Sequence, residues 1–170
     1  MTQQTPTAPA GRATGAHGGE AYQHPAGSCT LSLPALPSAA AVTRRHVRQL
    51  LRAWQLAAVT DTAQLMASEL VANAVSAAQP PDGGVLDGPQ LSPHPIELGV
   101  RRTEVSVIIE VRDPNPEPPS LQQADPLDEG GRGLLIIEIL GTRWGHHPAK
   151  GGGKVVWCEI AVTSAGPTDC

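Results

Sequence analysis

The stretch TDTAQLMASELVANAVSAAQ, residues 60–79, decides the fold. It is rich in helix-forming residues, ends before Pro80 and is apolar on nearly every side, which is typical of a helix buried in a core. Glu69 and Asn73 interrupt this apolar surface four residues apart, so their side chains lie on one face of the helix. The stretch has no Lys or Arg, and a buried carboxylate without a cation is costly unless charge or hydrogen bonds come from elsewhere. Glu69 is therefore either a functional residue that meets a metal ion or a substrate, or a residue at an exposed edge of the helix.

A second, amphipathic helix is expected over residues 39–54, after a short extended segment at 30–33 and with Ser38 at its N-cap. Its apolar residues follow the spacing of one helical face: Val47, Leu50, Leu51 and Trp54. Three arginines lie on another face at steps of four: Arg44, Arg48 and Arg52. This stripe is either a solvated surface or a surface that meets an acidic partner.

The rest of the core sequence predicts mainly strands. Alternating apolar and polar residues over 96–101 and 105–113 predict an antiparallel hairpin. A helix over 133–140 follows, and then strands over 142–147 and 155–163. The order β-α-α-β-β-α-β-β indicates an α+β fold, built as a two-layer sandwich rather than a doubly wound sheet.

Composition bounds the domain and excludes some partners. Residues 1–30 contain no Val, Leu or Ile, which predicts a disordered tail before a domain over 31–163 and a flexible C-terminus over 164–170. The net charge is −4, and the aromatic content is low, with three Trp, one Tyr and no Phe. Both properties argue against a nucleic-acid-binding surface. Three widely spaced cysteines and no apolar stretch long enough to span a bilayer favour a soluble protein in a reducing cytoplasm, without a membrane partner.

Two further stretches form a pattern with residues 60–79: DPNPEPP at 113–119 and EGGRGL at 129–134. A glycine-rich loop that opens a helix suits a phosphate group, because its backbone N–H groups and the helix dipole favour negative charge. In this order and at this spacing, the three stretches resemble the N, G1 and G2 boxes of the GHKL, or Bergerat-fold, ATPases. RWG at 143–145 and GGKVVWCE at 152–159 make the chain most similar to the actinobacterial branch of anti-sigma-factor serine/threonine kinases.

The resemblance covers roughly residues 31–163 and implies both a fold and an activity. The fold is a Bergerat-type sandwich, whose mixed, mostly antiparallel sheet is covered by helices on one face. The activity is that of an Mg·ATP-binding regulatory protein, a serine/threonine protein kinase that phosphorylates a small anti-sigma antagonist and sequesters a sigma factor. A homodimer is a further possibility.

The resemblance also assigns roles to the two polar residues of the N box. Asn73 would supply an oxygen ligand to Mg²⁺, an ion that prefers few protein ligands together with phosphates and waters. Glu69 would be the catalytic base that orients or deprotonates the attacking hydroxyl.

Four more residues would bind the nucleotide. Asp113 in the G1 box would accept a hydrogen bond from the amino group of adenine. Gly131 and Gly133 would approach the phosphates by their backbone, and Arg132 would neutralise phosphate charge.

Some residues depart from the family pattern. Pro114, Asn115 and Pro116 stand where a fuller G1 box has glycines, and Val155 stands where relatives often carry a base-binding Thr. These departures keep open a second interpretation, a non-catalytic, nucleotide-responsive binding module with weak or lost ATP binding. A third, the catalytic part of a sensor histidine kinase, is disfavoured because no membrane segment is predicted. The glycines of GGGK at 151–154 lack the pattern of a phosphate-binding P-loop and are interpreted as a hairpin turn.

Overall fold

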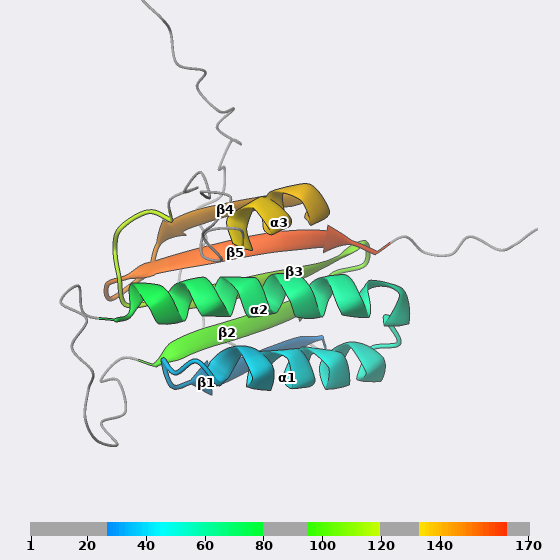
Figure 1. The fold of residues 1–170 in the computed structure, drawn as a ribbon. Coiled ribbons are helices and arrows are strands. Elements are labelled where there is room, and N and C mark those ends of the chain that lie inside the picture. Colours follow the sequence, from blue (N-terminus) through cyan, green and yellow to red (C-terminus); the bar gives the residue numbers. More distant parts are fainter. Residues whose placement is uncertain (1–26, 80–94, 120–132, 163–170) are drawn as a thin grey trace, which may run out of the picture.

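The computed structural model describes residues 27–79, 95–119 and 133–162. They form two layers, a five-stranded antiparallel sheet and a layer of helices on one of its faces (Figure 1). The strands lie in the order β1-β2-β3-β5-β4. Along the chain the elements are β1 Ser28–Leu33, α1 Ala39–Ala53, the short 3-10 helix η1 Ala57–Val59, α2 Thr60–Ala77, β2 Ile96–Arg102, β3 Ser106–Asp113, α3 Gly133–Leu140, β4 Arg143–Pro148 and β5 Lys154–Ala161.

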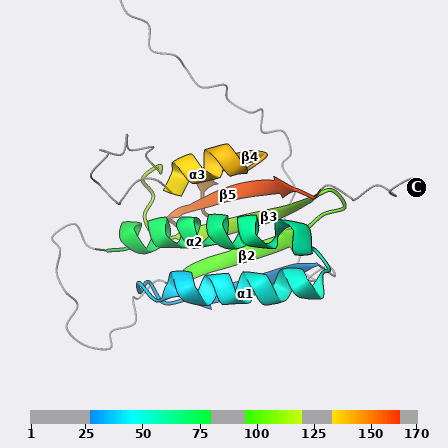
Figure 2. The same ribbon diagram turned by 45° about the vertical axis from the view of Figure 1, so that its right-hand side comes forward.

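Helix α2 is the central helix of its layer. It lies between α1 and α3 in both views (Figures 1 and 2) and packs on strand β3. Its nine buried residues are Thr60, Ala63, Met66, Ala67, Ser68, Leu70, Val71, Ala74 and Val75. The prediction of a buried helix in this stretch is confirmed, because neighbours on both sides and the sheet below cover most of its surface.

Helix α1 buries one narrow stripe. Ala39, Thr43, Val47 and Leu51 are buried at steps of four residues, whereas the arginines of the helix are exposed. Ser38 does stand at the N-cap, but its side chain makes no capping hydrogen bond. The helix is therefore held by packing of its apolar stripe more than by its cap.

The two faces of the sheet differ in chemistry. On β3, the side chains of Val107, Ile109 and Val111 are almost fully buried beneath the helices. The alternate positions face away from the helices and, apart from Ile108, carry polar groups, as in the ion pair of Arg112 with Glu97. The predicted alternation of side chains between the two faces of the strand is thus confirmed. The side chains on the buried face form the core between the sheet and the helices.

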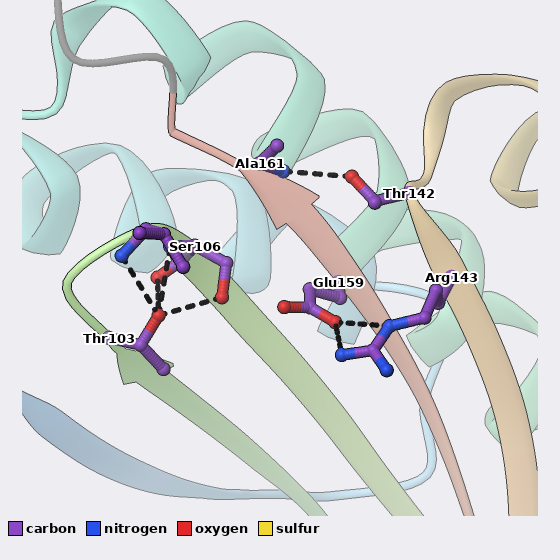
Figure 3. A network of polar contacts seen from close by, with 7 residues as sticks. Thr103, Ser106, Thr142, Arg143, Glu159 and Ala161 are labelled. Carbon is purple, nitrogen blue, oxygen red and sulfur yellow. Dashed lines mark hydrogen bonds and ion pairs between the residues drawn. The ribbon is translucent and has the colours of Figure 1, made fainter. Parts of the chain in front are cut away.

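A polar network on the helix-free face joins the ends of β3, β4 and β5 (Figure 3). Glu159 accepts a hydrogen bond of 2.8 Å from Nε of Arg143, which lies directly opposite on β4. Hydrogen bonds from Ser106 and then from Arg143 hold the pKa of the Glu159 carboxyl below its ordinary value, against the opposing effect of its burial. Thr103 closes the β2–β3 turn, because its hydroxyl oxygen accepts the backbone N–H of Ser106 at 2.9 Å.

The described residues confirm the predicted order of elements and refine it. Every strand pair is antiparallel, so this sheet is not mixed as the resemblance implies. Strand β1 begins at Ser28, so residues 28–30 belong to the sheet rather than to the predicted tail. The remaining tail residues, 1–26, and the predicted flexible C-terminus lie outside the described residues. Among the described helices, none has the length and apolar character needed to cross a membrane.

The turn between β4 and β5 is built from three successive glycines with positive φ. Gly151, Gly152 and Gly153 have φ values of 86°, 105° and 79°. Side chains rarely adopt this backbone conformation, which explains why glycines fill the turn. The interpretation of GGGK as a hairpin turn is confirmed.

Candidate nucleotide-binding site

The N-box residues meet the beginning of α3. Glu69 and Asn73 lie one turn apart on α2, and both are half-buried. A Cβ atom on Gly133, the first residue of α3, would lie 2.8 Å from Oε2 of Glu69 and 3.2 Å from Nδ2 of Asn73. The backbone of α3 therefore approaches these two polar groups as closely as glycine allows.

Asp113 lies at the end of β3, in a different environment. Its side chain is only 2% exposed, and its Oδ1 accepts the backbone N–H of Asn115 at 2.9 Å. The same oxygen accepts a hydrogen bond of 2.9 Å from Nζ of Lys154, the first residue of β5. Nζ of Lys154 also donates to the carbonyl oxygen of Asn115 at 3.0 Å. Asp113 is thus already paired with a cation.

Asn115 connects this end of β3 to α2. Its Nδ2 donates to the carbonyl oxygen of Ala77 at 3.3 Å. Ala77 follows Asn73 by four residues, which is slightly more than one helical turn and about 6 Å along the axis. The start of α3 and the end of β3 therefore meet neighbouring turns in the C-terminal half of α2.

A groove of about 440 Å³ runs along the seam between α1 and α2. Arg44 and Arg48 line it from α1, and Asp61, Gln64 and Glu69 are among its residues from α2. Neither arginine forms an ion pair with another described residue. Glu69 therefore borders both the start of α3 and a groove that carries two guanidinium groups with no ion-pair partner within residues 27–79, 95–119 and 133–162.

The structure brings some of the expected site residues together and leaves others apart. Glu69, Asn73 and Gly133 are in mutual proximity, whereas Gly131 and Arg132 lie outside the described residues. The residue that sequence reasoning missed is Lys154. The sequence offered no local signal for it, because its place opposite Asp113 depends on the register of β5 against β3.

The register of β5 also changes how one departure is understood. Lys154 lies directly opposite Asp113, and Val155 lies opposite Arg112. Because side chains alternate along a strand, Val155 points to the face of the sheet away from Asp113. The residue that occupies the neighbourhood of Asp113 is thus Lys154 and not Val155.

The donor set at Asn73 fits Mg²⁺ bound together with a nucleotide. No group of three or more His, Cys, Asp or Glu side chains that could hold a metal ion occurs in the described parts of the chain. Mg²⁺ does not require such a group, because it is commonly held by one or two protein oxygens, several waters and substrate phosphates. Asn73 therefore fits the Mg²⁺ role that the resemblance implies, whereas the carboxylate of Asp113, which was expected to bind adenine, is engaged by Lys154.

A comparison with protein families agrees with this geometry. The family model described as the histidine kinase-like ATPase domain matches residues 33–159, which is most of the chain and includes every described site residue. The chain therefore belongs to the family of histidine kinase-like ATPase domains. This membership supports an ATP-binding regulatory function. No match was found among curated proteins.

Proposed function

We propose that this chain is an Mg·ATP-dependent serine/threonine protein kinase that phosphorylates a small antagonist protein and also sequesters a sigma factor. The observation that carries the proposal is the contact of Gly133 with Glu69 and Asn73. It joins the residues proposed for metal binding and base catalysis to the helix start proposed for phosphate binding. This is the arrangement that phosphoryl transfer needs, because such catalysis depends mainly on positioning and charge neutralisation.

Each residue has a stated task in the proposed reaction. Asn73 holds Mg²⁺ through its side-chain oxygen, and Glu69 accepts the proton of the attacking hydroxyl. Bound Mg·ATP supplies the phosphoryl group and a cation that neutralises its charge. Gly133 allows the backbone of α3 to lie against both side chains, where a larger residue would displace Glu69.

The groove between α1 and α2 favours a protein acceptor over water. Arg44 and Arg48 give its α1 wall two positive charges, and Glu69 lies in the opposite wall. An acceptor segment with acidic residues would pair with the arginines and bring its hydroxyl toward Glu69. The arginine stripe of α1, which the sequence offers as a surface for an acidic partner, would then bind the acceptor protein.

The alternative function is a non-catalytic, nucleotide-responsive binding module. The ion pair of Asp113 with Lys154 favours it, since it engages the carboxylate proposed to bind adenine. In this case nucleotide binding would be weak and would serve to order the site rather than to transfer phosphate.

Thermal unfolding with Mg·ATP tests the nucleotide site. Ligand at about one hundred times its dissociation constant stabilises the folded state by about 2.7 kcal/mol, a rise in Tm of about 5 to 10 °C for a chain of this size. We expect this rise in the wild type and its loss in Asn73→Ala. Gln49→Ala, which removes an exposed amide from α1, is the matched control and keeps the rise. A wild type that does not respond to millimolar Mg·ATP contradicts the proposal.

The Glu69→Gln variant separates the two functions. It removes a base but keeps the size of the side chain, so we expect normal Mg·ATP binding and ADP production at least about a hundredfold slower. Glu110→Gln, on the helix-free face of the sheet, is the control. If the wild type binds Mg·ATP but forms neither ADP nor phosphoserine on an acceptor protein, the non-catalytic module is the correct function.

A further inference from the structure

The Asp113–Lys154 pair differs from the other ion pairs of the described residues in its burial. Its two side chains are 2% and 7% exposed. In the pairs of Arg112 with Glu97 and of Arg143 with Glu159, at least one partner is more than a third exposed. A buried ion pair is weak evidence of net stability, because the cost of removing two charges from water offsets their attraction. The position of the Asp113–Lys154 pair in the proposed nucleotide site is therefore more informative than its effect on stability.

The backbone holds Lys154 in this position. Strands β3 and β5 pair with Asp113 and Lys154 directly opposite each other, so both side chains lie on the helix side of the sheet. The preceding residue, Gly153, packs so tightly that a Cβ atom there would lie 2.0 Å from the carbonyl oxygen of Asp113. The start of β5 thus has little freedom to move away from Asp113.

The ammonium group uses the acceptor that an adenine amino group needs. Both hydrogen bonds described at the Asp113 carboxylate, from Lys154 Nζ and from Asn115 N–H, go to Oδ1. An amino group that bonds to Asp113 must displace Nζ or use the other oxygen beside a positive charge. In either case the interaction with the carboxylate is weakened, because Nζ and the amino group are both donors.

We propose that Lys154 is a specificity-determining residue of the nucleotide site. By holding the Asp113 carboxylate, Lys154 lowers the affinity of the site for adenine. It also reduces discrimination against bases that carry an oxygen in place of the amino group. The inference rests on the proposed nucleotide binding and concerns only its base end. A carbonyl oxygen at that place accepts a hydrogen bond from Nζ, whereas it would be repelled by Asp113 alone. The lysine therefore makes the site tolerant of both kinds of purine.

The test compares ADP and IDP, whose bases differ in having an amino group or a carbonyl oxygen at the same carbon. Dissociation constants are measured by calorimetry with Mg²⁺ on the full chain. In Lys154→Thr, which removes the charge and most of the side-chain volume, we expect ADP to bind more tightly. We also expect the ratio of the IDP to the ADP dissociation constant to rise at least about tenfold, equivalent to about 1.4 kcal/mol.

Two more variants make the comparison decisive. Lys154→Met removes the charge at nearly constant length and should change the ratio in the same direction, so it serves if the threonine variant does not fold. Lys150→Thr removes the same charge from an exposed position on the same hairpin and should leave the ratio unchanged.

The outcomes distinguish this inference from the proposed function. An unchanged ratio in both Lys154 variants, or weaker ADP binding in them, overturns the role of Lys154 while the nucleotide site stands. If no variant and no wild type binds either nucleotide, the proposed function fails and this inference fails with it.

Discussion

Replacing Gly153 by alanine tests whether the glycine turn holds β5 against Asp113. An alanine Cβ at this position would lie 2.0 Å from the carbonyl oxygen of Asp113 and 2.9 Å from Cα of Pro114, both backbone atoms that cannot rotate away. Gly152 is a matched control, since its φ is also positive but a Cβ there would meet nothing within 4 Å. The two variants therefore share backbone strain and differ in steric contact.

The magnitudes follow from this difference. Alanine at a positive φ costs about 1 to 3 kcal/mol at either position. At Gly153 the two strands must also separate, because an ordinary contact needs 3.4 Å or more and the Cβ would lie at 2.0 Å. Such overpacking costs a further 1 to 3 kcal/mol or so. We expect Gly153→Ala to have a Tm about 2 to 12 °C below that of Gly152→Ala, at about 2 to 4 °C per kcal/mol.

Urea denaturation of the wild type and both variants, followed by circular dichroism, measures the free energies of unfolding. Equal m-values would show that the same surface is exposed in each case. If Gly153→Ala is as stable as Gly152→Ala, the close approach of the turn to Asp113 is refuted, and with it the backbone argument for the position of Lys154.

Two further predictions concern polar groups outside the site. The hydroxyl of Thr43 on α1 is fully buried and has no hydrogen-bond partner in the described part of the chain. Thr43→Val should therefore raise the free energy of unfolding by about 1 kcal/mol. If urea denaturation shows that the variant is less stable than the wild type, the hydroxyl has a partner and the reasoning is wrong. Because the pKa of Glu159 is lowered in the folded state, its stabilisation is present above the ordinary pKa of 4.5 and is lost as the pH falls through the folded value. Glu159→Gln should therefore cost about 1 kcal/mol at pH 7, a modest amount since the Arg143 side chain is 70% exposed. The deficit should shrink as the pH falls below 4.5, and a deficit that stays constant down to the lowest pH at which the wild type is folded would contradict this cause.

The sequence alone was enough to predict most elements and part of the site. The period of 3.6 in α1 and the period of 2 in β2 and β3 arise from which side of each element is buried, so they can be read locally. Helix α2 was predictable because it is apolar on nearly every side and ends before Pro80. Glu69 and Asn73 were predictable as a pair because four residues make one helical turn. The resemblance assigned both residues and Gly133 to one nucleotide site, and the structure adds the close approach of Gly133 to the two side chains.

Only the tertiary structure decided what Asp113 meets. Lys154 follows it by 41 residues, and the pairing depends on the register of β5 against β3. A shift of one residue would have put Val155 beside Asp113 and turned the lysine to the other face, because side chains alternate along a strand. The glycine turn, the β4–β5 hairpin and the core beneath α2 together select that register. A local pattern could therefore indicate a strand at residues 154–161, whereas the charge beside the proposed base-binding carboxylate was determined by how distant segments pack.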